Sequence, residues 1–256
     1  MRPTQETYDE WQLAYQVFNQ VLFDEQLPDC LITLQREKNT MGYFSKARFA
    51  NRAGEKTDEI ALNPAYFAVS GMREALQTLG HEMVHLWQHH YGEPGRGRYH
   101  NAEWADKMES IGLMPSSTGR PDGKRTGDRM ADYIIEGGVF EHAITAVKKA
   151  GFELKWMDRF IAMPGCRQQA MLPDMEATLS ASLTQMPEAA IRHGLAEAFG
   201  MDTQLADTLD IKISRLTQNK QGNRSKYTCP ECDTNLWGRP GLNIQCGDCQ
   251  IAFDEH

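Results

Sequence analysis

The sequence lacks long hydrophobic runs. No segment approaches the roughly 18–20 apolar residues that a membrane-spanning helix needs, so we expect no contact with a membrane. The N-terminal segment MRPTQETYDEWQ is polar and has no apolar core of the secretory type, which predicts a cytoplasmic protein. An excess of basic residues is also missing, because 27 Lys and Arg face 35 Asp and Glu and give a net charge of −8. That balance argues against a general nucleic-acid-binding surface.

Positive charge is nevertheless concentrated in two stretches. Residues 120–129 and residues 212–239 carry most of their charged side chains as Lys or Arg. The simpler interpretation of each stretch is a solvated linker. Contact with DNA through these local basic segments remains the alternative, and the sequence does not fix the oligomeric state.

Cysteine is scarce over most of the chain and concentrated at its end. Of six cysteines, four lie in the last 28 residues as two Cys-x-x-Cys pairs separated by 13 residues. The pairs are Cys229 with Cys232 and Cys246 with Cys249. Each pair forms a tight turn that directs two thiolates to one point, so together they predict a structural, tetrahedral Zn²⁺ site in a zinc ribbon. Cys30 and Cys166 are isolated, and we expect them to be small buried residues.

The hydrophobic pattern predicts an α+β protein with a small antiparallel sheet packed against helices. Predicted helices are residues 6–25, 72–90, 101–111 and 139–150, and predicted strands are residues 31–35, 41–49, 59–62 and 133–135. The polar, Gly-containing segment 115–129 is expected to be a loop. Residues 174–217 are rich in Ala, Leu and Met and predict two or three short helices, which a polar linker follows over 218–228.

The predicted helix 72–90 contains the sequence His81-Glu82-Met83-Val84-His85. On a helical wheel His81 and His85 lie about 40° apart, one turn from each other, which suits two imidazole ligands of one Zn²⁺. Leu76, Leu79, Met83 and Leu86 form an apolar stripe on roughly the opposite side. Glu82 lies about 60 to 100° from the two histidines around the helix, which is poorly placed to bind the metal but near enough to accept a proton from a metal-bound water molecule.

A catalytic zinc usually takes three protein ligands and keeps one position open. The metzincin pattern is excluded, because it requires Gly and His where this chain has Gln88 and Tyr91. The remaining candidates are His89, His90, Glu93, His100 and Glu103. Spacing alone favours His100 over Glu103 by a small margin, because a loop able to fold back precedes it.

Both motifs occur in a chain that resembles the SprT-like family of zinc metallopeptidases, to which the Spartan proteases belong. The resemblance is carried by FNQVLFDEQLP, by MGYFSKARF with DEIALNP, by LQTLGHEMVHLWQHHYGEPGRGRYHNAEWADKMESIGL and by SKYTCPECDTNLWGRPGLNIQCGDC. It covers residues 10–115 and 225–253, and residues 116–150 more loosely. It implies a compact α+β protease domain in which His81, His85 and His100 hold the catalytic Zn²⁺ and Glu82 is the catalytic residue.

The resemblance divides the chain into a protease domain over residues 1–159, a helical linker or insert over 160–226 and the ribbon over 227–256. It implies a zinc-dependent endopeptidase with one catalytic and one structural Zn²⁺. For the Spartan branch it also implies cleavage of proteins crosslinked to DNA. The alternative function is a non-catalytic zinc-ribbon protein that binds DNA or the transcription machinery. Residues 160–217 match nothing in the family that indicates their role.

Overall fold

The computed structural model describes residues 2–37, 40–162, 212–214 and 225–255. The chain divides into two compact units, Met1–Leu216 and Thr217–His256, and each is described by itself. The first unit combines helices with small sheets, which confirms the α+β class. No helix in the described ranges is long and apolar enough to cross a membrane.

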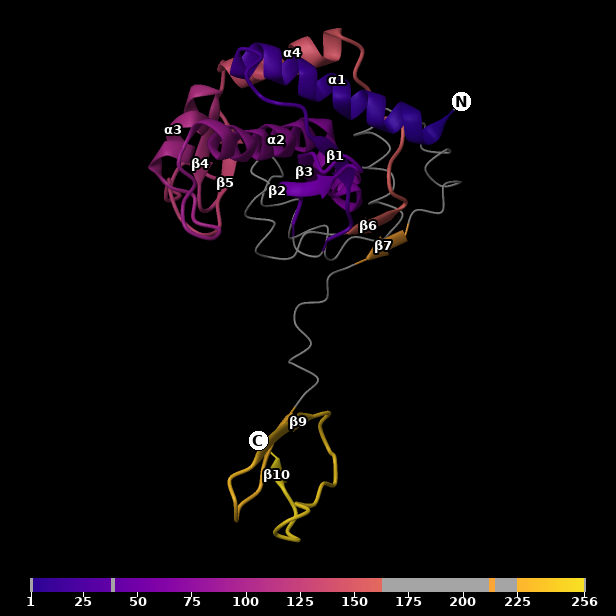
Figure 1. Cartoon of the computed structure of the whole chain (residues 1–256), viewed down its shortest axis with the longest axis vertical. Coiled ribbons are helices and arrows are strands. Elements are labelled where there is room, and N and C mark those ends of the chain that lie inside the picture. The colour runs from indigo at the N-terminus through magenta and orange to yellow at the C-terminus, as the bar shows by residue number, and fades with distance from the viewer. Residues whose placement is uncertain (1, 38–39, 163–211, 215–224, 256) are drawn as a thin grey trace. The chain divides into compact units, whose positions relative to one another are not determined.

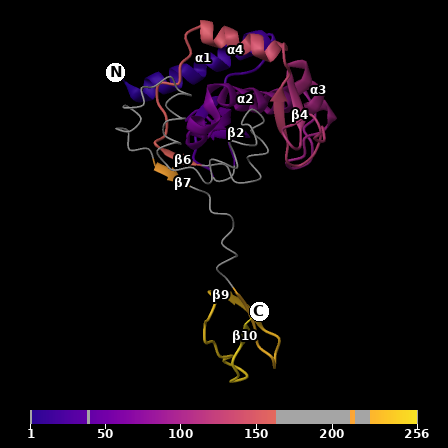
Figure 2. The same ribbon diagram turned by 180° about the vertical axis from the view of Figure 1, so that it is seen from behind.

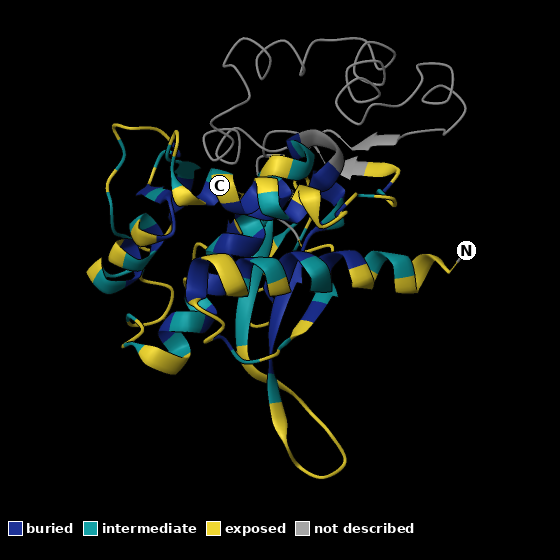
Figure 3. Cartoon of the chain, turned by 90° about the horizontal axis from the view of Figure 1, so that it is seen from above, coloured by how far each residue is buried: buried dark blue, intermediate teal, exposed yellow. Residues whose placement is uncertain are grey.

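The first helix, α1 (Pro3–Phe23), forms because its apolar residues recur at helical spacing. Its buried residues include Trp11, Ala14, Tyr15, Phe18 and Leu22. Figure 3 shows buried residues along one side of this helix and exposed residues along the other. The helix ends at Asp24, whose backbone is left-handed with a φ of 53°.

A second helix, α4 (Val139–Lys149), packs along α1. The rings of Phe18 and Phe140 lie 5.1 Å apart at this contact. In Figures 1 and 2 this pair of helices lies on one side of α2 (Pro64–Tyr91), and the main sheet lies on the other. The helix α2 is therefore sandwiched between the two layers.

The main sheet consists of β1 (Leu31–Leu34), β2 (Gly42–Ala50) and β3 (Lys56–Leu62), in the order β1-β3-β2. The strands β2 and β3 are antiparallel, as predicted, but β1 runs parallel to β3, so the sheet is mixed and not fully antiparallel. Patterning identifies a strand without specifying its partner. The strand β3 is central: β2 pairs with one of its edges in a hairpin, and β1 pairs with the other.

The helix α2 begins after Asn63, whose side chain accepts a hydrogen bond from the Ala65 N–H at 3.2 Å. Its backbone breaks at Gly71, which has a φ of 78°, so the predicted helix 72–90 corresponds to the part that follows the break. The predicted stripe of Leu76, Leu79, Met83 and Leu86 is fully buried. This buried stripe fixes the rotation of the helix about its axis and directs the face that carries His81 and His85 toward α3.

Beyond α2, the chain forms α3 (Ala102–Ser110) and an antiparallel pair, β4 (Leu113–Ser116) and β5 (Ala131–Ile134). The expected loop 115–129 is thus shorter, because its first two residues belong to β4. A further parallel pair joins β6 (Phe160–Ala162) to β7 (Lys212–Ser214). The prediction of helices over 174–217 is wrong at residues 212–214, which form β7. The rest of that segment and Cys166 lie outside the described residues.

The second unit is a three-stranded antiparallel sheet in the order β10-β8-β9. Its strands are β8 (Ser225–Thr228), β9 (Asn235–Gly238) and β10 (Asp254–Glu255). The predicted linker 218–228 therefore ends earlier than expected, because its last four residues are a strand. Among the described residues of this unit, Tyr227 is the large side chain that is buried, at 1% exposure. One buried ring is a small core, which leaves the folding of this unit dependent on other contacts.

Candidate metal centres

Three histidine side chains converge beside the buried face of α3. His81 and His85 come from α2, and His100 comes from the end of the loop that precedes α3. One ring nitrogen of each lies within 4.8 Å of the others. The Nε2 atoms of His85 and His100 are 3.1 Å apart. The structure thus brings together the two helical histidines and His100, the candidate that spacing only slightly favoured.

Hydrogen bonds to the backbone hold His100 in place. Its N–H donates to the Gly127 carbonyl at 2.8 Å, and the Gly127 N–H donates back at 3.1 Å. The His100 Nδ1 lies 3.0 Å from the same carbonyl. A carbonyl only accepts, so Nδ1 carries the hydrogen and the lone pair of Nε2 is left to face the other histidines.

The competing candidate Glu103 has a different role. Its carboxylate accepts hydrogen bonds from the Gln88 side chain and from the Glu93 N–H, both at 2.7 Å. Gln88 also donates to Asn101 at 2.8 Å. These contacts tie the loop between α2 and α3 to the end of α2, so Glu103 stabilises the position of His100 and is not one of the converging groups.

His81 has a buried acidic partner that sequence patterns do not indicate. Its Nδ1 lies 2.8 Å from Oδ1 of Asp132, on β5. Gln77 donates to the other carboxylate oxygen at 2.7 Å and to the Asp132 carbonyl at 2.9 Å. Asp132 and Gln77 are both buried. A carboxylate on Nδ1 fixes the imidazole so that Nε2 is free, which is the arrangement common in metal-binding histidines.

The charge state of the cluster fits a metal ion. Burial lowers the pKa of His85 well below its ordinary value and lowers the pKa of His100 to about 4, and the neighbouring His81 acts in the same direction. Both rings are therefore neutral at pH 7. Burial also lowers the pKa of His81, but its hydrogen bond to Asp132 and the negative charges of Glu82 and Asp132 together outweigh burial and raise the pKa overall.

An apolar wall closes the back of the cluster. The fully buried Trp104 places its ring centroid 5.1 Å from that of His81, 5.5 Å from that of His85 and 4.4 Å from that of His100. The indole excludes water from one side of the histidines. It also restricts their rotation, so the donor atoms are preorganised.

Glu82 is buried between α2 and the edge strand β2. Burial raises the pKa of its carboxyl group to about 7, against the opposing effect of His81, and the Phe44 N–H of β2 hydrogen-bonds to it. Close approach of the strand requires Gly42, because a Cβ there would lie 2.8 Å from Cγ2 of Thr78 and 2.9 Å from the Ala61 carbonyl. The acidic side chain thus contacts the edge strand β2 and interacts electrostatically with His81.

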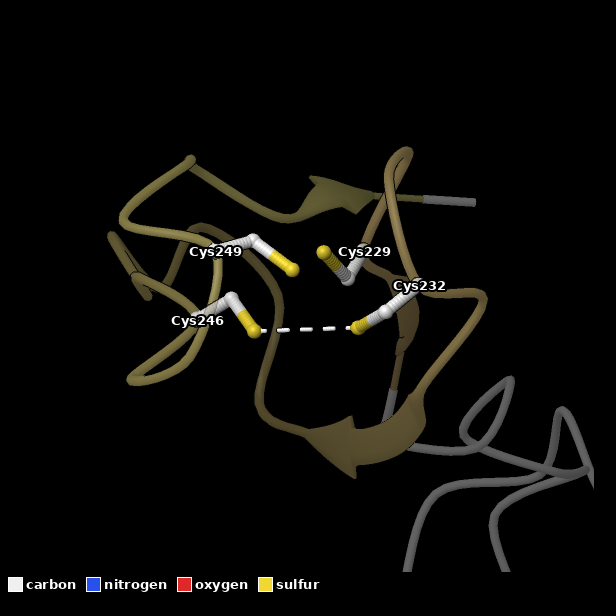
Figure 4. A group of neighbouring side chains, drawn as sticks. All are labelled: Cys229, Cys232, Cys246 and Cys249. Atoms are coloured by element: carbon white, nitrogen blue, oxygen red, sulfur yellow. Dashed lines mark hydrogen bonds between the residues drawn. The ribbon is translucent and has the colours of Figure 1, made fainter.

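A second candidate centre lies in the C-terminal unit. Figure 4 shows the sulfur atoms of Cys229, Cys232, Cys246 and Cys249 directed toward one another. All four lie within 4.8 Å of one another, and the sulfurs of Cys232 and Cys246 are 3.8 Å apart. Hydrogen bonds from Thr234 lower the pKa of the Cys232 thiol to about 6, whereas the hydrogen bond with Cys232 raises the pKa of Cys249, so the thiolate is favoured at Cys232 first.

The two Cys-x-x-Cys turns have the same backbone structure. In the first, the Cys229 N–H donates to the Thr234 carbonyl, five residues on, and Asp233 is left-handed with a φ of 56°. In the second, Cys246 donates to Ile251 and Gln250 has a φ of 58°. Repetition of one turn on both sides of the cluster is the arrangement expected of two metal-binding knuckles. The four thiols and the three histidines are therefore groups that could each hold a metal ion.

Comparison with known proteins agrees with this architecture. The model of the SprT-like family matches residues 11–122, which include all three converging histidines. A protein of Salmonella typhimurium, described as "Uncharacterized protein in mucB 3'region", is 61% identical over 59 residues, which are 23% of this chain and 80% of that protein. No solved structure matches the chain significantly. The chain belongs to the SprT-like family, a family of metallopeptidase type.

Proposed function

We propose that the protein is a zinc-dependent endopeptidase with its active centre at His81, His85 and His100. The observation that supports this most strongly is the convergence of three imidazoles beside a buried glutamate. A Zn²⁺ ion held by these rings would act as a Lewis acid and lower the pKa of a water molecule. Three ligands suit a catalytic site, because a fourth position stays open to substrate.

The other steps of the reaction are carried out by residues around the three histidines. Glu82 accepts the proton of the attacking water and passes it to the leaving amine. Asp132 orients His81, and Trp104 excludes water from the rear of the site. We propose that the substrate lies extended along β2, since this strand is at the edge of the described sheet and its Phe44 N–H contacts Glu82.

In the second unit, we propose that Cys229, Cys232, Cys246 and Cys249 hold a structural Zn²⁺. Four thiolates fill a tetrahedral site and leave no position for substrate. The small core of this unit supports a structural role, because the ion then provides much of the folding free energy.

We further propose, on the basis of the family resemblance, that the substrates are proteins bound or crosslinked to DNA. The basic stretch at 120–129 offers only limited support, because Arg125 is paired with Asp106 and Glu109 of α3. We therefore propose that DNA contacts the C-terminal unit and the basic stretch at residues 212–239. Trp237 of β9 is 62% exposed there, opposite Lys226 of β8, and an exposed ring beside a cation suits stacking on a base.

The test is cleavage of a protein–DNA crosslink and of the same protein free, with and without single-stranded DNA. Zinc-loaded wild type is compared with Glu82→Gln, which keeps the shape of the side chain but cannot accept the proton. We expect cleavage that requires both Glu82 and DNA. Cleavage by wild type that is indifferent to DNA would leave the protease and remove the DNA-directed role. Equal activity of the Glu82→Gln protein would refute the mechanism, and DNA binding without cleavage would favour a non-catalytic binding protein.

A further inference from the structure

A further group of potential ligands lies at the C-terminal end of α2, the helix that carries His81 and His85. It consists of His89 and His90, in the last turn of α2, and Asp58 on β3. One ligand atom of each residue lies within 4.8 Å of the others. The group is separate from His81, His85 and His100, so His89 and His90 are not part of the first cluster.

Asp58 is held by a specific feature of the backbone. Its carboxylate is buried, and Oδ1 accepts a hydrogen bond from the Ala47 N–H at 2.6 Å. Ala47 lies in the irregular part of β2, where the pairing with β3 shifts between Ser45 and Phe49, and its φ is 47°. A positive φ is unfavourable for alanine, and the hydrogen bond to Asp58 offsets part of that cost. One carboxylate oxygen is thus fixed while the other is directed at the histidines.

The two imidazoles complete the group from the helix. Nε2 of His90 lies 2.7 Å from Oδ2 of Asp58. The ring of His89 packs 5.8 Å from the ring of Phe44, which restricts its orientation. The side chain of His90 is 35% exposed, so an ion can reach the group from solvent. Burial lowers the pKa of His89, with His90 and Lys46 acting in the same direction and Asp58 opposing them.

We propose that Asp58, His89 and His90 form a third metal site, which binds a divalent transition-metal ion such as Zn²⁺. Two imidazoles and one carboxylate suit zinc and its neighbours better than Mg²⁺ or Ca²⁺, which prefer oxygen ligands. Three protein ligands leave the remaining positions to water. Because the site is partly exposed and is approached by the positive charge of Lys46, it binds more weakly than the buried three-histidine and four-cysteine groups.

Binding at this site has a structural consequence. The ion connects the last turn of α2 to the central strand β3 and, through Asp58 and Ala47, to the irregular part of the edge strand β2. It therefore fixes the strand whose other end contacts Glu82. The proposal does not depend on catalysis, since the ligands and their contacts are separate from the three histidines.

The test counts metal ions on the full-length chain. Protein stripped with a chelator is dialysed against a series of buffers of increasing free Zn²⁺, and bound zinc is measured by atomic emission. We expect wild type to reach three equivalents, the last of them at higher free zinc than the first two. The His89→Ala/His90→Ala double variant should stop at two, with unchanged circular dichroism.

The matched control is His142→Ala, which removes an exposed histidine from α4 and should still reach three equivalents. The third step in the single variant His90→Gln should require at least tenfold more free zinc. The proposal is overturned if wild type stops at two equivalents, which would leave Asp58 and His90 as a hydrogen-bonded pair only. It is equally overturned if the double variant keeps the third ion, or if His142→Ala loses it.

Discussion

Replacing Asp132 with asparagine is expected to weaken metal binding at the three-histidine cluster by about tenfold. The wild-type hydrogen bond joins the His81 Nδ1 to a charged carboxylate, buried and 2.8 Å away. A hydrogen bond to a charged group contributes about 1.5–3 kcal/mol and a neutral one about 0.5–1.5 kcal/mol. The difference of about 1–1.5 kcal/mol corresponds to about one order of magnitude in affinity and lies at the lower end of the range for outer-shell partners of metal ligands.

The neighbouring glutamine supplies a second, independent check. Gln77 donates to Asp132 and does not touch the histidine ring, so Gln77→Leu should weaken metal binding less than Asp132→Asn. If Gln77 acts only through Asp132, the double variant should bind no more weakly than Asp132→Asn alone.

The assay is competition with a chelator whose affinity for zinc is known, with the release of each equivalent followed separately. The control is Asp9→Asn, an exposed carboxylate of α1. A folded Asp132→Asn protein that releases zinc at the same chelator concentration as wild type would show that Asp132 does not position His81. Loss of helical circular dichroism would instead indicate a structural role, and Asp132→Glu would then be measured as the conservative variant.

Three further changes test the packing and the second unit. Gly80→Ala places a methyl group 2.6 Å from the buried Phe140 ring and should lower the free energy of unfolding by about 1–3 kcal/mol in denaturant titrations. Cys246→Ser should abolish the metal-dependent ordering of the C-terminal unit, seen as loss of dispersed amide signals by NMR, while the signals of the first unit persist. Burial raises the pKa of Cys30 to about 12, whereas an unfolded thiol ionises near pH 8.5, so its stabilising effect is present below about pH 8.5 and is lost as the pH rises toward 12. Cys30→Ala should therefore lose stability less steeply over that window, by at most about 1.4 kcal/mol per pH unit in denaturant titrations.

Local sequence signals predict the parts of the site that lie on one element. The spacing of His81 and His85 places both rings on one face of a helix, and the apolar stripe determines which way that face points. His100 requires a loop to fold back, and the residues that fix the loop, Gln88 and Glu103, carry no pattern of their own. Sequence spacing therefore left several candidates for the third ligand and favoured His100 over Glu103 only slightly, and the resemblance to a known family made that choice firmer.

Asp132 could not be predicted, for a physical reason. It lies 51 residues from His81 and reaches it only because β5 pairs with β4 beside α2. In the sequence it is one polar residue in a short apolar run, with nothing to separate it from a solvent-facing residue of a strand. The parallel pairing of β1 escaped prediction in the same way, because alternation identifies a strand but not its neighbour.

The two principal centres differ in what the fold must provide before an ion can bind. At the three-histidine cluster the donors are preorganised by α2, by the Gly127 carbonyl and by Asp132, so most of the ordering is done by a hydrophobic core that does not need the ion. At the four-cysteine cluster the donors lie within 21 residues, from Cys229 to Cys249, beside the buried ring of Tyr227. There a bound ion would itself be the main tertiary contact. If both clusters hold zinc as proposed, chelation should leave the first unit folded but inactive and should unfold the second.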